Sequence, residues 1–179
     1  SLEGTLEYNL EAAGDALNKP ISDLEVVVMD RPRHEDLISK IQTMGAKVSL
    51  IGDGDITAAL DSADSSSSTD LLMGIGAAPE GVITATALRG LNAFFEGRLV
   101  TTNPDHKKRA IQMLGDKMEH IWKRDELCSS KDSVYIGSGV CRGRIPGPTQ
   151  NSVGSIVVTS EVIDVSTSTT RIEKMTFDV

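Results

Sequence analysis

Aromatic residues and cysteines are scarce in this chain of 179 residues. Aromatics make up 3% of the sequence, so a hydrophobic core must be built from Val, Ile, Leu, Ala and Met. Cys128 and Cys141 are the only cysteines. Two thiols in a chain of this size are typical of a reducing compartment, where disulfides rarely persist. We therefore expect free cysteines and an intracellular location, either the cytoplasm or, in a photosynthetic eukaryote, the plastid stroma.

Long apolar runs and basic clusters are also missing. No run approaches the roughly 18 apolar residues of a membrane-spanning helix, and residues 1–5 have neither the charged nor the apolar region of a signal peptide. With 26 acidic and 18 basic residues, the net charge is -8. A nucleic acid is bound through its phosphate backbone by a basic face, which this chain lacks, so we expect no nucleic acid among the partners. The missing apolar run likewise leads us to expect no membrane among them. The first residue is not Met, so the chain is expected to begin inside a longer sequence or after a processed segment.

Several catalytic signatures are absent too. His34, His106 and His120 lack metal-ligand spacing, both with each other and with the cysteines. Neither a Gly-x-Ser-x-Gly elbow nor a P-loop occurs. His34 is expected to start a helix rather than to act as a base.

What is present is an alternation of strand and helix patterns. Residues 24–29 form a nearly continuous β-branched run, which is typical of a strand covered on both faces. The predicted strands of this part are residues 24–29, 47–51, 71–75 and 98–101, and the predicted helices are residues 8–17, 35–44, 56–60, 79–94 and 107–127. Short connections between alternating strands and helices indicate right-handed crossovers and a largely parallel sheet.

The C-terminal part changes character. Residues 133–136, 155–162 and 171–177 are alternating, β-rich runs separated by Gly, Pro and Ser, and we predict strands that complete or flank the sheet. The chain contains no repeat. Residues 1–179 are therefore expected to form a single α/β domain, with a largely parallel sheet flanked by helices and a β-rich C-terminal part.

Charged and glycine-rich turns follow three of the predicted strands. They comprise residues 30–34 (Asp-Arg-Pro-Arg-His), 52–55 (Gly-Asp-Gly-Asp) and 74–81 (Gly-Ile-Gly-Ala-Ala-Pro-Glu-Gly). Ligands of a parallel sheet bind outside the carboxyl ends of its strands, and all three turns lie at that edge. Together they supply cations, carboxylates and a turn that leads into a helix. Their convergence predicts a ligand site.

In the first turn, Arg31 and Arg33 are held apart by the rigid Pro32. Their guanidinium groups offer forked donors to a phosphate. The alternative is that one of them pairs with a neighbouring acid such as Asp30 or Glu35, because surface arginines often do so.

The second and third turns carry carboxylates. Asp53 and Asp55 flank Gly54, which allows a sharp turn that aims them at sugar hydroxyls; alternatively, Asp55 is the N-cap of the next helix. The free amides at the start of the helix near Pro79 favour an anion. Glu80, in that first helical turn, is either a candidate ligand of Mg²⁺ or Mn²⁺ or an ordinary acid favoured by the helix dipole.

These segments resemble a known family. Residues 26–34 (Val-Val-Val-Met-Asp-Arg-Pro-Arg-His), 52–55 and 73–83 are similar to the class II fructose-1,6-bisphosphatases. The sequences of these motifs most resemble those of the cyanobacterial type, which also hydrolyses sedoheptulose-1,7-bisphosphate. The similarity runs from residue 8 to the C-terminus and is weaker after residue 104.

The resemblance implies a fold and a set of roles. The fold would be the C-terminal α/β half of the lithium-sensitive phosphatase superfamily. The arginine turn would hold a substrate phosphate, the aspartate turn would meet the substrate, and alanine in the third turn would contact it through its backbone. The implied substrate-binding residues are Arg31, Pro32, Arg33, Asp53, Gly54, Asp55 and Ala77, and the implied ligand of Mn²⁺ or Mg²⁺ is Glu80.

The chain also departs from the family. Members carry a long N-terminal region with further metal ligands, including an Asp-Pro-x-Glu-Gly-Thr motif, and only residues 3–5 (Glu-Gly-Thr) match it, as a remnant or by chance. The implied reaction is hydrolysis of the 1-phosphate of fructose-1,6-bisphosphate, in gluconeogenesis or the Calvin cycle, with two or more metals. Because one carboxylate holds a hard cation weakly, we expect the chain alone to be weakly active or inactive.

Three hypotheses remain open. The chain is part of a bisphosphatase that works with a missing N-terminal half or a homologous subunit, a truncated paralogue that binds sugar phosphates, or a structural element of a homo-oligomer or larger assembly. Retention of the arginine, aspartate and glutamate positions argues against a purely structural role.

Overall fold

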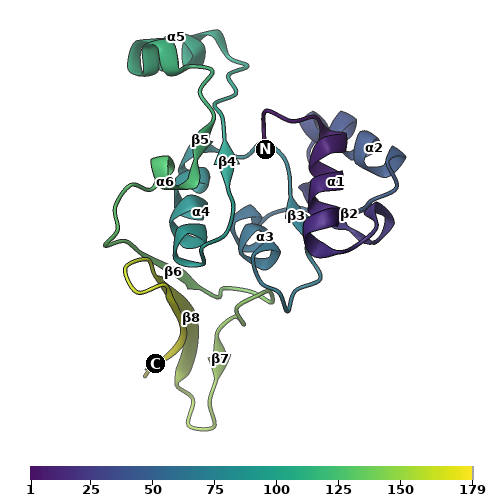
Figure 1. Cartoon of the computed structure of the whole chain (residues 1–179). Helices are drawn as coiled ribbons and strands as arrows, with labels where there is room; N and C mark the ends of the chain where they lie inside the picture. The colour runs from purple at the N-terminus through teal and green to yellow at the C-terminus, as the bar shows by residue number, and fades with distance from the viewer. Residues whose placement is uncertain (179) are drawn as a thin grey trace.

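Helices and strands alternate through the first half of the chain, and strands dominate its C-terminal part (Figure 1). The structure is a computed structural model that describes residues 1–178. The helices are α1 (Leu6–Leu17), α2 (Glu35–Thr43), α3 (Asp55–Ser62), α4 (Ala78–Gly90), α5 (Pro104–Leu114) and α6 (Arg124–Leu127). The strands are β1 (Glu25–Met29), β2 (Lys47–Ile51), β3 (Leu71–Leu72), β4 (Glu96–Gly97), β5 (Trp122–Lys123), β6 (Val134–Ser138), β7 (Thr149–Gln150), β8 (Ile156–Asp164) and β9 (Thr169–Phe177).

The parallel sheet is built around β1, which pairs in parallel with β2 on one side and β3 on the other. Val26 and Val28 of β1 share one face of the sheet and are fully buried with Leu10 of α1 and Ile41 of α2. Successive side chains of a strand point to opposite faces, and Val27 on the other face is only 5% exposed. The strand is therefore covered on both faces, as its β-branched run predicted.

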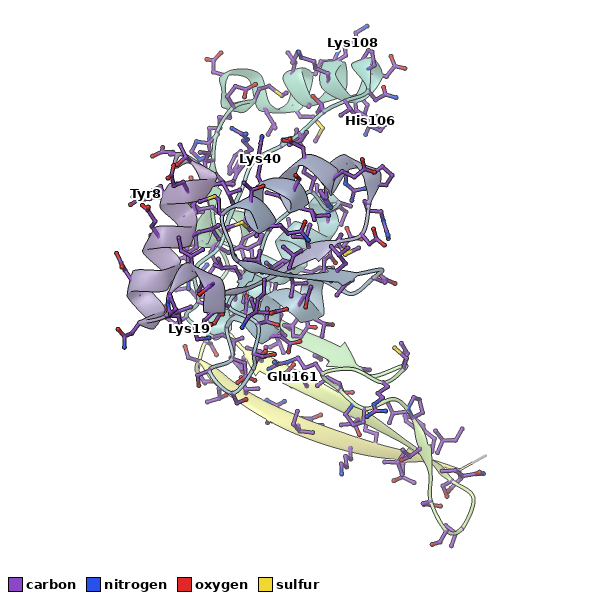
Figure 2. The ribbon with its side chains drawn as sticks, turned by 90° about the vertical axis from the view of Figure 1, so that its right-hand side faces the viewer. Tyr8, Lys19, Lys40, His106, Lys108 and Glu161 are labelled. Atoms are coloured by element: carbon purple, nitrogen blue, oxygen red, sulfur yellow. The ribbon has the colours of Figure 1, made fainter. Side chains whose placement is uncertain are left out.

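The C-terminal strands form a sheet of their own. β8 pairs in antiparallel fashion with β6, β7 and β9, and Figure 2 shows the long β8–β9 hairpin extending away from the helical body. This sheet flanks the parallel sheet rather than completing it. Ile163 of β8 anchors it, because that side chain is fully buried against Leu60 of α3 and Ala87 of α4.

Two predictions were wrong for the segment of the chain that joins the parallel sheet to the C-terminal sheet. The strand in this part is Glu96–Gly97, not residues 98–101, and it forms a two-stranded antiparallel ribbon with β5. The helix predicted over residues 107–127 is α5, which ends at Leu114 because Gly115 adopts a positive φ of 53°. A glycine takes this conformation readily, and it cannot continue a right-handed helix. Figure 1 shows α5 projecting from the rest of the molecule.

The two cysteines remain thiols. Cys128 is buried and Cys141 is exposed, and the structure leaves both unpaired, as predicted. No helix within residues 1–178 has the length and apolar character needed to cross a membrane.

A half-buried arginine joins the second sheet to α3. The Arg144 guanidinium donates to both carboxylate oxygens of Glu161 on β8, over 2.9 and 2.8 Å. Its Nη1 also donates to Asp61, over 2.8 Å, and to Asp64, over 3.1 Å. Glu161 is only 3% exposed and lies where the hairpin meets the body in Figure 2. The pKa of Asp64 is lowered, first because Ser66 donates hydrogen bonds to it and further by Arg144.

We expect Arg144→Met to lower the free energy of unfolding by about 3 kcal/mol, because it leaves Glu161 buried without its charge partner. Urea denaturation at neutral pH measures the change. The matched control is Arg142→Met, at an exposed position that forms no ion pair with any residue the structure describes. That variant should stay within about 0.5 kcal/mol of the parent. Equal effects from the two variants would contradict the role given to Arg144.

Candidate functional site

The three turns that follow β1, β2 and β3 meet at one edge of the parallel sheet. Arg31 Nη2 in the first turn donates to the carbonyl of Gly52 in the second, over 2.7 Å. Arg33 donates to the carbonyl of Ile75 in the third turn, from Nε over 3.0 Å and from Nη2 over 2.6 Å. The first turn is therefore hydrogen-bonded to both of the others. The convergence predicted from parallel strand ends is present.

The two arginines bind backbone carbonyls rather than acids. Arg31 also donates from Nη1 to the carbonyl of Asp30, over 2.8 Å. Within residues 1–178, neither arginine forms an ion pair with Asp30 or Glu35, so the alternative of a local salt bridge is wrong. Carbonyl oxygens carry no net charge, and both guanidinium charges stay uncompensated by these contacts. Pro32 lies between the arginines and opens a 3₁₀ turn.

The second turn depends on the left-handed conformation of Gly54, whose φ is 88°. This conformation suits glycine and is costly for other residues. Gly54, and not Asp55, is the N-cap of α3. Asp55 is the first residue of the helix, and its Oδ1 accepts a hydrogen bond from the Ile56 amide over 2.9 Å. The Oδ1 of Asp53 likewise accepts from the Gly54 amide, over 2.8 Å.

The second and third turns are in close contact. A Cβ built on Gly76 would stand 2.8 Å from Oδ2 of Asp55. That separation is shorter than any normal carbon–oxygen contact, so the absence of a side chain at Gly76 is what lets the aspartate approach the backbone.

The third turn presents the uncapped start of α4. The parallel ladder ends with the Met73 amide, which donates to the Val27 carbonyl over 3.1 Å. Gly74 then has a φ of 150°, so β3 ends earlier than the predicted residue 75. Ala77 is the N-cap of α4 and provides no side-chain hydrogen bond. The first amides of this helix are therefore free of side-chain caps, which favours binding of an anion.

Glu80 lies in the first turn of α4 and is half-buried. Its Oε2 is shielded from solvent and has no hydrogen-bond partner among the described residues. A buried carboxylate oxygen without a partner is costly, and a cation would remove that cost. However, the part of the chain that the structure describes contains no group of three or more His, Cys, Asp or Glu arranged to hold a metal ion. Glu80 therefore has the chemistry to supply one oxygen ligand to a cation, and the described residues do not form a complete metal site around it.

His34 also belongs to this site, at the end of the first turn, although the sequence predicted only that it starts a helix. It is the last residue before α2, close to the helix start that was predicted. Its side chain, however, is 1% exposed, and it links Met29 to the third turn through Nδ1 and Nε2. The signal that could have found this contact is the position of His34 directly after Arg33, in a turn that faces the Gly-x-Gly segment of the third turn.

The geometry defines an α/β domain with two guanidinium groups, aspartates and an uncapped helix at one sheet edge. The family described as bacterial fructose-1,6-bisphosphatase, glpX-encoded, has a sequence model that matches residues 1–177. The chain belongs to this family.

Curated relatives from cyanobacteria are similar to the chain. The protein named D-fructose 1,6-bisphosphatase class 2/sedoheptulose 1,7-bisphosphatase of Synechococcus sp. (strain JA-3-3Ab) is 43% identical over 149 residues, which cover 76% of this chain and 43% of the relative. The proteins of the same name from Prochlorococcus marinus (strain MIT 9312) and Gloeobacter violaceus are 39% and 37% identical, over 91% of this chain and 53% and 51% of their own lengths. The chain thus spans about half the length of the curated relatives it matches.

We expect Gly76→Ala to displace the Asp55 carboxylate, because the added methyl group would overlap Oδ2. The Ile56 amide, which donates to Asp55, should change its chemical shift in a ¹H–¹⁵N correlation spectrum, with a stability cost of about 1 kcal/mol. Gly52→Ala is the matched control, since nothing lies within 4 Å of its added Cβ. If both variants leave the Ile56 resonance in place, the contact between the two turns is refuted.

Proposed function

We propose that this chain is the sugar-phosphate-binding part of a metal-dependent bisphosphatase that hydrolyses the 1-phosphate of fructose-1,6-bisphosphate, with sedoheptulose-1,7-bisphosphate as a second substrate. Family membership and the names of the relatives support the substrate class. The observation that carries the proposal is the convergence of the three turns, with Arg31 and Arg33 reaching across to the other two. In the cell, the activity would serve gluconeogenesis or the Calvin cycle.

The arginine turn is proposed to bind a phosphate group. A guanidinium group has five N–H donors, and the backbone contacts use two on Arg31 and two on Arg33. The donors that remain, together with the uncompensated charge, can engage phosphate oxygens. Pro32 fixes the spacing between the two side chains.

The second turn and the start of α4 are proposed to complete the substrate site. Asp53 and Asp55 each have one carboxylate oxygen engaged by a backbone amide. The other oxygen of each is left to accept from sugar hydroxyls, while Gly54 provides the sharp bend between them. At the start of α4, the backbone of Ala77 can contact the substrate, and the uncapped amides favour the negative charge of a phosphate.

Glu80 is proposed to ligate a divalent cation, Mn²⁺ or Mg²⁺. Its unpartnered Oε2 supports this role. A bound cation of this kind would polarise the phosphoryl group and lower the pKa of a water molecule. Because such cations need several oxygen ligands, further carboxylates must come from elsewhere, either from the additional half that the relatives possess or from a homologous subunit in a homo-oligomer.

A second candidate is a catalytically inactive paralogue that binds sugar phosphates or serves as an assembly module. The incomplete metal site favours this alternative, since the described residues contain no group of three or more His, Cys, Asp or Glu arranged to hold a metal ion. Both candidates predict that the chain binds a sugar phosphate, and only the first predicts that the phosphate is hydrolysed.

Calorimetry with fructose-1,6-bisphosphate and Mn²⁺, combined with a phosphate-release assay, tests both candidates. Arg33→Ala should weaken binding about tenfold or more, because a hydrogen bond to a charged group is lost. Arg142→Ala removes the same charge from an exposed position outside the three turns and should leave the affinity unchanged.

Turnover separates the candidates. The chain alone should bind substrate with little or no phosphate release. Adding the separately expressed complementary half of a cyanobacterial relative should restore hydrolysis if the chain is part of an enzyme. Binding without hydrolysis in either case would support the inactive paralogue, and no binding at all would contradict both.

A further inference from the structure

Two consecutive residues of the first turn hold both polar groups of Ile75. Its carbonyl accepts from Arg33 Nε and Nη2, over 3.0 and 2.6 Å. Its amide donates to Nε2 of His34, over 2.8 Å. The other ring nitrogen of His34, Nδ1, lies 2.7 Å from the carbonyl oxygen of Met29, the last residue of β1. The imidazole thus bridges the end of β1 and the third turn.

The chemistry of the two partners fixes the protonation of the ring. The Met29 carbonyl can only accept, so Nδ1 must carry a hydrogen. The Ile75 amide can only donate, so Nε2 must present its lone pair. His34 is therefore neutral in its Nδ1–H form, with both ring nitrogens satisfied at a position that is 1% exposed. No solvent is needed to complete these bonds.

The ring also fits against a glycine. A Cβ built on Gly74 would stand 3.1 Å from Cε1 and 3.2 Å from Nε2 of His34. Gly74 additionally has a positive φ of 150°, so both its conformation and its space call for glycine. The imidazole therefore packs closely against the backbone of the turn that it holds.

This double contact orients the peptide groups ahead of α4. The amide and carbonyl of a planar trans peptide point in opposite directions. With the Ile75 carbonyl turned toward Arg33, the Gly76 amide must point away from that guanidinium group. With the Ile75 amide turned toward His34, the Gly74 carbonyl points away from the imidazole. The backbone that leads to Ala77 and the uncapped start of α4 is thereby set in one orientation.

We propose that His34 is a positioning residue for phosphate binding: its unprotonated Nε2 holds the Ile75 amide and so fixes the third turn in the orientation in which the start of α4 meets the anion. This role rests on the proposed function above. It does not require His34 to touch the substrate or to transfer a proton.

Two amide substitutions separate the two contacts of the ring. In His34→Gln the longer side chain places an amide oxygen near the position of Nε2, where it can accept from Ile75 but loses Met29. In His34→Asn the shorter side chain can donate to Met29 but leaves the Ile75 amide without an acceptor. Each variant loses one buried hydrogen bond, so a purely structural role predicts similar losses of stability and of affinity in both.

The positioning role predicts a difference between them. The full 179-residue chain is titrated with fructose-1,6-bisphosphate by calorimetry, after urea denaturation has shown that both variants fold. We expect the Gln variant to bind within about threefold of the parent and the Asn variant to bind about tenfold more weakly. Equal affinities of the two variants would overturn the proposal.

Two spectroscopic measurements test whether Nε2 of His34 holds the Ile75 amide, and neither needs substrate to bind. The ¹⁵N spectrum of the His34 ring should show a protonated Nδ1 and an unprotonated Nε2. Exchange of the Ile75 amide hydrogen should be slow in the parent and the Gln variant and faster in the Asn variant. If the parent fails to bind the bisphosphate, the proposed function fails, while a ring protonated at Nε2 or equal exchange rates would refute the positioning role itself.

Discussion

The hydrogen bonds from the first turn to its two neighbours are the interactions on which the site depends. Parallel strands bring their carboxyl ends to one edge, but they do not fix the loops that follow. Arg31 binds the Gly52 carbonyl, and Arg33 and His34 together bind the polar groups of Ile75. Side chains that are usually counted as ligand-binding groups therefore also maintain the shape of the site, which gives a preorganised backbone before any ligand arrives.

The electrostatics of the site are local. The whole chain has a net charge of -8, so its overall field does not attract a sugar bisphosphate. The arginines in the first turn are bound to neutral carbonyls, and the first amides of α4 lack a side-chain cap. These groups supply positive potential at short range, whereas the unpartnered oxygen of Glu80 supplies the opposite charge nearby in sequence. The proposed function uses these groups for a phosphate bound together with a cation.

The sequence predicted the parts of the fold that local patterns control. The β-branched run of β1, the alternation of strands with helices and the glycine-rich turn before α4 all led to correct elements. The family was recognised from the three turns and is confirmed. The remainder depended on information outside any local window. β4 pairs with β5, and β8 pairs with β6 as well as with β9, so these strands depend on partners that lie elsewhere along the chain. The contact between His34 and Ile75 was hidden for the same reason, because it joins residues 41 positions apart. The roles of the substrate-binding and metal-binding residues stay predictions.

A titration followed by ¹H–¹⁵N correlation spectroscopy tests most directly whether the three turns act as one site. Fructose-1,6-bisphosphate is added to the labelled chain, and the amides of residues 30–34, 52–55 and 74–81 are monitored together. Our account predicts that resonances in all three turns shift and saturate with a common dissociation constant, while those of β8 and β9 stay in place. Shifts confined to a single turn, or centred on the second sheet, would contradict it.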